Sequence, residues 1–135
     1  RIDNRIEALN DSSIYSILQE KADELFDQMN LIIRNNPDEK ALHRIRIMLK
    51  ELIYTLSIIK KGKGKSKLEK SALTYLEYLQ QVLGDWHDLK VLFDNVNCIN
   101  VKSSSLLKVI EFDKEVKRIV VLHELKKIDG MCLYT

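Results

Sequence analysis

The clearest chemical signal in the sequence is a set of basic side chains at helical spacing. A projection at about 100° per residue places five polar residues on one face of a helix: His43, Arg46, Lys50, Ser57 and Lys61. This face borders the apolar stripe of the same helix, so its side chains can be partly desolvated. Cations gathered where the effective dielectric is lowered hold a phosphate more strongly than at a fully exposed surface. The pattern suits a phosphate-binding face, but spacing alone favours a solvated face of an amphipathic helix.

The loop after this helix adds to the positive charge. Residues 40–67 hold nine basic residues and one acidic residue, whereas the whole chain has a net charge of only +2. Such a segment gathers polyanions. The Gly-Lys-Ser triplet at residues 64–66 resembles part of a nucleotide-binding phosphate loop, but Ile59 stands where that motif needs its first glycine. We therefore expect a flexible basic loop instead. The positive potential around the basic face of the helix would be extended by three lysines, Lys61, Lys63 and Lys65.

A second cluster of chemically active side chains comprises Asp85, Trp86, His87 and Asp88. Two carboxylates and an imidazole this close together can bind a divalent metal or transfer protons. The other interpretation is structural: Asp85 caps a helix, Trp86 is half-buried, and the acids favour the helix dipole. We find no second pair of ligands at metal-binding spacing in the sequence. We therefore predict no catalytic residues, no metal site and no cofactor.

The composition is that of a helical globular protein. The chain has 135 residues, of which 45% are hydrophobic and 31% charged, with one proline and four glycines. This length suits one domain over residues 1–135, and so few helix breakers favour long helices. No apolar run reaches the ~20 residues that span a bilayer, so we expect no membrane insertion. The two cysteines, Cys98 and Cys132, are too few for a disulfide framework, and we expect a reducing, cytoplasmic location.

Hydrophobic periodicity predicts an all-α fold, an antiparallel bundle of four to five helices. The first helix covers about residues 13–34. The second starts near Pro37, with Asn36 as its N-cap, and ends at Gly62. Its stripe of core residues would be Leu42, Ile45, Leu49, Leu52, Leu56 and Ile59.

The second half of the chain is predicted to contain three shorter helices. Ser66 and Glu69 form a capping box for a helix that ends at Gly84, and Asp85 caps a short helix to about residue 97. A break at residues 100–103 precedes the last helix. Its core stripe would be Leu106, Ile110, Val116, Val120 and Leu125.

Two stretches of the sequence together resemble a known family. Residues 42–56 read LHRIRIMLKELIYTL and resemble the signature helix of the CHAD (conserved histidine α-helical) domain, and residues 79–91 read LQQVLGDWHDLKV and resemble its later segment. The resemblance implies a helical protein that binds inorganic polyphosphate through basic side chains. The family domain is a duplication, and this chain is more similar to its second half. The matching positions are His43, Arg46 and Lys50. Where the family often has further arginines, this chain has Glu51 and Ile53, which implies weaker binding.

These observations predict non-catalytic binding of inorganic polyphosphate, phosphate or a similar phosphate-rich polyanion. Arg46 and Lys50 would contact phosphate directly, and His43 would donate a hydrogen bond. Two alternatives stay open: a metal-dependent phosphoester or polyphosphate hydrolase using Asp85, His87 and Asp88, and a helical protein-interaction module without a small ligand. We do not expect nucleic acid as a partner. A homodimer that joins two copies of the basic face would take the place of the other half of the duplicated domain, and the alternative is that this other half lies outside this sequence.

Overall fold

The computed structural model describes residues 2–62, 68–99 and 104–134, and for residues 2–12 and 104 it describes the backbone alone. The elements are the helices α1 (Ile2–Arg34), α2 (Glu39–Lys61), α3 (Lys70–Cys98) and α4 (Ser104–Lys126). Within these ranges there is no β-strand, and a single isolated bridge joins Leu68 to Tyr134. The all-α, antiparallel fold predicted from the sequence is confirmed, with four helices.

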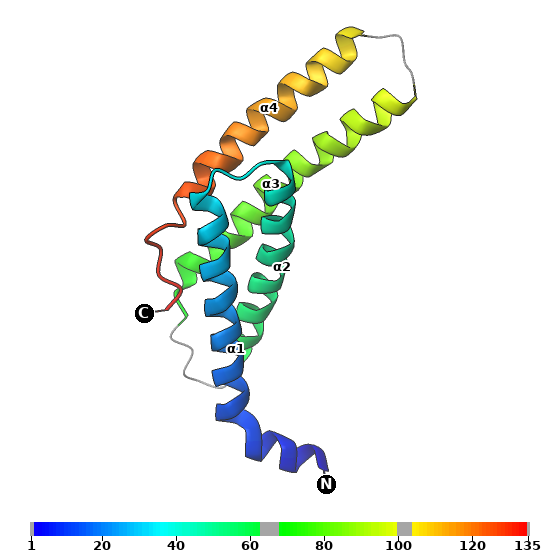
Figure 1. Cartoon of the computed structure of the whole chain (residues 1–135). Coiled ribbons are helices and arrows are strands. Elements are labelled where there is room, and N and C mark those ends of the chain that lie inside the picture. Colours follow the sequence, from blue (N-terminus) through cyan, green and yellow to red (C-terminus); the bar gives the residue numbers. More distant parts are fainter. Residues whose placement is uncertain (1, 63–67, 100–103, 135) are drawn as a thin grey trace.

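The chain forms two helical hairpins that lie against each other (Figure 1). In the first hairpin α1 packs along α2, and the first half of α3 packs against α2. The end of α3 and the start of α4 extend together beyond the α1–α2 turn (Figure 1). None of the helices, in the residues that the structure describes, is long and apolar enough to cross a membrane.

The core between the helices is built on the stripe predicted for α2. All six predicted residues of that stripe are buried. They meet Ala22, Leu25 and Met29 of α1 and a leucine-rich face of α3. Burying a Leu or Ile side chain contributes ~1.5–3 kcal/mol, so this three-helix seam fixes which side of α2 is left for solvent.

The start of α2 differs from the prediction. Asn36 is not the N-cap: it has a φ of 51°, a left-handed conformation that asparagine tolerates better than most residues. The cap is Asp38, whose carboxylate accepts a hydrogen bond from the Ala41 amide at 2.8 Å. The helix then runs as predicted to Gly62. The helix start was predicted wrongly because proline is common in the first turn of a helix, whereas Pro37 here lies in the turn before the helix.

The third predicted helix ends too early. Gly84 does not end α3, and Asp85 does not cap a new helix, since α3 is continuous from Lys70 to Cys98. Trp86, predicted to be half-buried, is completely buried, as is Leu83. A glycine inside a helix costs ~1 kcal/mol relative to alanine, less than the burial of these large side chains on both sides of it gains.

The predicted capping box before α3 is also wrong in its register. Glu69 occupies the cap position itself, makes no side-chain bond to the backbone, and accepts a hydrogen bond from the Ser71 hydroxyl at 3.1 Å. Its backbone amide instead donates to the Leu133 carbonyl at 2.8 Å. Ser66, Lys63 and Lys65 lie outside the described residues.

The last helix faces the core with a different side than predicted. Of the five predicted core residues Ile110 and Leu125 are buried, but Leu106, Val116 and Val120 are exposed, and Val121 is buried instead. The sequence of α4 has apolar residues on two sides, so periodicity alone could not choose between them.

Several polar contacts anchor α4 and the segment after it to the rest of the molecule. The Tyr75 hydroxyl lies 2.6 Å from a carboxylate oxygen of Glu124 and 2.9 Å from its carbonyl. Arg34 pairs with Asp129 at 2.8 Å, and Lys114 pairs with Glu39 at 3.1 Å.

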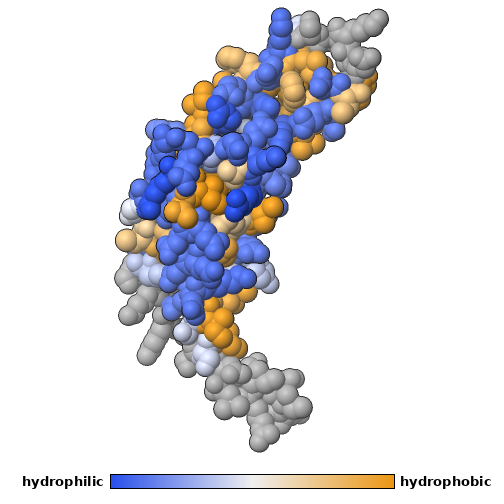
Figure 2. All heavy atoms as spheres, viewed as in Figure 1, coloured by the Kyte–Doolittle hydropathy of each residue, from blue (hydrophilic) through white to orange (hydrophobic). Residues whose placement is uncertain are grey.

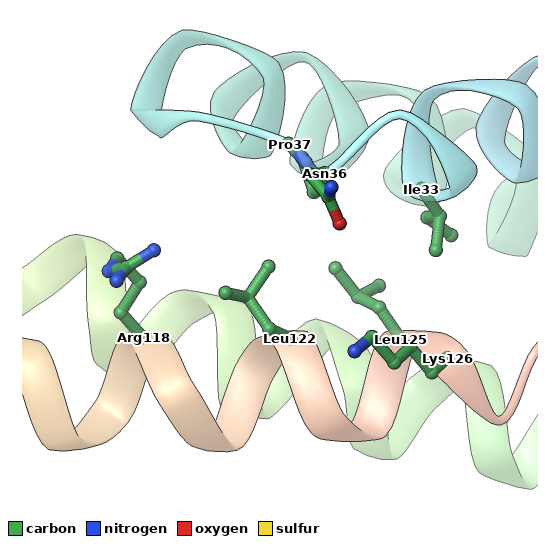
Figure 3. Close-up of a pocket in the computed structure, with 7 residues that line it drawn as sticks. All are labelled: Ile33, Asn36, Pro37, Arg118, Leu122, Leu125 and Lys126. Atoms are coloured by element: carbon green, nitrogen blue, oxygen red, sulfur yellow. The ribbon is translucent and has the colours of Figure 1, made fainter.

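Between the α1–α2 turn and α4, a cavity of about 150 Å³ has apolar walls and a rim of two cations (Figure 3). Its lining residues are Ile33, Asn36, Pro37, Arg118, Leu122, Leu125 and Lys126.

Candidate phosphate site between α2 and α3

The structure groups three of the predicted site residues on α2 and places Lys61 apart from them. His43, Arg46 and Lys50 follow one another at three- and four-residue intervals on α2, with Arg46 half-buried and the other two exposed. Lys61 lies in the last turn of α2. At ~1.5 Å per residue it is about 16 Å along the helix from Lys50. Ser57 is not available as a free donor on this face, because its hydroxyl donates to the Ile53 carbonyl at 2.8 Å.

The imidazole of His87 on α3 joins the predicted basic face. The rings of His43 and His87 are stacked, with centroids 5.8 Å apart and planes inclined by 28°. The sequence analysis placed His87 only in a separate acidic cluster, so its position beside the basic residues was missed. The signal that could have found it is that each of the two family-like stretches contains one histidine.

The surroundings of His87 disfavour its protonated form. Burial lowers the pKa of His87, electrostatic interactions with Arg46, His43 and Lys90 lower it further, and Asp88 opposes them in part. Its Nδ1 atom is buried and has no hydrogen-bond partner among the described residues. A neutral imidazole can donate through one nitrogen and accept through the other, so His87 has one polar ring atom without a partner among the described residues.

Arg46 and Lys50 form one wall of a groove of about 260 Å³, and α3 forms the other. The α3 wall carries the side chains of Glu77, Gln80, Gln81, Asp85 and Asp88, with Gly84 between them. Asp85 accepts a hydrogen bond from the Gln81 amide at 3.1 Å. In the part of the chain that the structure describes, neither Arg46 nor Lys50 is in an ion pair with a carboxylate. Their donors therefore remain available to a ligand, although three acids lie in the same groove.

A comparison with known protein families identifies the family of the chain. The model of the CHAD domain family matches residues 3–95, more than half of the chain. The chain belongs to the CHAD domain family. The match includes both walls of the groove and both stacked histidines, whereas α4 lies beyond it. No curated protein and no solved structure matches the chain significantly.

The acidic cluster of this CHAD domain divides between two directions. Asp85 and Asp88 both line the groove, whereas His87, ~200° around the helix from Asp85, stacks on His43. Among the described residues, no group of three or more His, Cys, Asp and Glu side chains lies close enough to hold a metal ion. The residues of the hydrolase alternative therefore do not converge on one point, even though two of them share the groove with Arg46 and Lys50.

Proposed function

We propose that this CHAD domain binds inorganic polyphosphate, or a similar phosphate-rich polyanion, without turning it over. The observation that carries the proposal is the placement of Arg46 and Lys50, one helical turn apart on the rim of a groove and without ion pairs among the described residues. Their spacing, about 6 Å along α2, lets one phosphate chain contact both side chains. Membership of the CHAD family supports the same ligand class.

Each member of the proposed site has a distinct task. Arg46 can hold two oxygens of one phosphate with its planar guanidinium, and its partial burial strengthens those bonds. Lys50 adds a mobile point charge at the next phosphate. His43, stacked on His87, donates a hydrogen bond. The positive potential of Lys61, Lys63 and Lys65 would attract the polymer from a longer range. Salt screens this attraction beyond the Debye length of ~8–10 Å.

The acidic wall of the groove should limit the affinity. Glu77, Asp85 and Asp88 repel an anion that enters between α2 and α3. A polymer that lies along the exposed edge of α2 avoids part of this repulsion, whereas a single phosphate deep in the groove does not. We therefore propose a preference for extended polymers over orthophosphate.

A titration with three ligands tests the proposal. Long-chain polyphosphate should bind with a steep loss of affinity between about 50 and 200 mM salt, because bound cations release counterions from a linear polyanion. Duplex DNA should bind more weakly, because we identify no helix in the sequence that presents base-reading side chains. Equal affinity for DNA would contradict the site and leave only general electrostatic attraction.

Hydrolysis is the second candidate, because Asp85 and Asp88 share the groove with the two cations. Incubating polyphosphate with the chain and magnesium, and measuring released orthophosphate, separates the two functions. We expect no release. Sustained release that stops on Asp85→Asn would establish the hydrolase instead.

The remaining predictions belong to the same proposal. A failure of every polyanion to bind would favour the interaction module without a small ligand. The homodimer through the basic face would form only when a polyanion neutralises the facing cations. The cytoplasmic location rests on cysteine usage; Cys98 and Cys132 are both free and exposed.

A further inference from the structure

Helix α4 carries a second apolar stripe that faces solvent. Val109, Phe112, Val116 and Ile119 are exposed by 59%, 69%, 42% and 57%. The core-facing residues of the same helix, such as Ile110 and Val121, lie more than 90° away from the centre of this stripe. On the face shown in Figure 2, hydrophobic side chains reach the surface along the hairpin of α3 and α4. A helix that is apolar on two sides is expected to pack against a neighbour on each side. Among the described residues α4 contacts α3 and α1, and this stripe stays exposed to solvent.

The spacing of this stripe is that of a coiled coil. Its four residues recur at intervals of three, four and three, so Val109 and Val116 occupy a positions and Phe112 and Ile119 occupy d positions of a heptad. Valine at both a positions suits a two-stranded coiled coil, and the charges beside the stripe decide whether the pair is parallel. Helix α4 lies outside the residues that match the CHAD family, so the match assigns it no role.

The charges beside the stripe indicate what the partner is. In this register Lys108 is a g residue and Asp113 is the next e residue, five positions later. In a parallel pair, a g residue of one chain faces that e residue of the other, so two identical chains would form this ion pair twice. Neither side chain is in an ion pair in the described part of the chain.

An antiparallel pair of the same helices is less favourable. When the apolar residues of two antiparallel copies are aligned, Val109 faces Ile119 and Phe112 faces Val116 of the second copy. Position 114 then lies beside position 114 of the second copy. Asp113 then lies near Asp113 of the second copy, and Glu115 lies near Glu115. Like charges at such positions destabilise the pair. Glu115 is in addition already held by Arg118 at 2.6 Å.

We propose that two copies of this chain associate through parallel α4 helices. Val109, Phe112, Val116 and Ile119 form the seam, and Lys108 pairs with Asp113 of the other copy on both sides. This dimer does not use the basic face of α2, and it forms without a polyanion. It is therefore independent of the proposed function.

Sedimentation equilibrium of the full chain, without polyphosphate, tests the dimer. At about 50 µM we expect a dimer for the unmodified chain and a monomer for Phe112→Asp. The matched control is Leu31→Asp on α1, because Leu31 is exposed by 61%, and this variant should remain a dimer. A monomeric unmodified chain, or equal loss of the dimer in both variants, would overturn the proposal. Circular dichroism verifies that both variants keep their helix content.

A charge exchange tests the parallel arrangement and the identity of the partner. Lys108→Asp alone should raise the dimer dissociation constant about 10- to 30-fold, because both ion pairs become like-charge contacts. Adding Asp113→Lys should return the constant to within about threefold of the unmodified chain, since the pairs re-form with exchanged signs. No recovery in the double variant would rule out the parallel self-pairing.

Discussion

Removing two cations from the α2 face is the most direct test of the proposed site. The perturbation is Arg46→Ala combined with Lys50→Ala, which takes away both basic side chains that line the groove. Both positions lie beside the buried stripe of α2 and neither side chain is fully buried, and alanine is a good helix former, so the fold should persist.

The size of the effect follows from the exposure of each side chain. A charge-assisted hydrogen bond contributes ~1.5–3 kcal/mol, and the half-buried Arg46 should reach the middle of that range. Lys50 is exposed and screened, so we assign it ~1 kcal/mol. The sum of ~3 kcal/mol corresponds to a loss of roughly a hundredfold in affinity. The slope of log K against log salt should also decrease by ~1.4, as expected for two fewer contacts to a single-stranded polyanion.

Isothermal titration with long-chain polyphosphate at two salt concentrations measures both quantities. The matched control is Lys40→Ala with Arg44→Ala, which removes one lysine and one arginine from another side of the same helix. The control should lose no more than about threefold, through the weaker overall field. Equal losses in the two double variants would refute the local site, because only diffuse electrostatics would remain.

Three further variants probe the surroundings of the site and the packing of α4. Polyphosphate affinity should rise as pH falls from about 8 to 6, because a bound anion raises the lowered pKa of His87, and His87→Gln should reduce this rise in the same titration. In the free chain the stability of the fold depends on pH in the opposite direction, because His87 takes up a proton more readily in the unfolded state. The free energy of unfolding should therefore fall as the pH drops below about 6.5, and it should fall less in His87→Gln than in the unmodified chain. Asp88→Asn should raise polyphosphate affinity about two- to fivefold at low salt, and an unchanged affinity would show that the acidic wall does not face the ligand. Tyr75→Phe removes the hydroxyl that contacts Glu124, so we expect a loss of ~1–2 kcal/mol in stability, seen as a fall in Tm of about 3–8 °C, with unchanged polyphosphate affinity.

The sequence predicts the elements of this fold better than their ends. The α2 stripe was correct at every position, because a helix with one strongly apolar side has one way to bury it. The break predicted at Gly84 was wrong, because local propensity weighed more in the prediction than the packing of Leu83 and Trp86, which only the folded chain provides. In α4 two apolar sides competed, and the choice between them depends on where α3 lies.

The same distinction explains what could be predicted of the candidate site. A helical projection gives directions around one helix, so it placed His43, Arg46 and Lys50 on one face of α2, but it says nothing about the neighbouring helix. The stacking of His87 on His43 and the acids opposite Arg46 depend on how α3 lies along α2. That placement required α3 to continue through Gly84, since the predicted break would have put His87 on a separate helix. Because this helix end was predicted wrongly, the sequence analysis missed the α3 wall of the groove and its carboxylates, which oppose an anionic ligand.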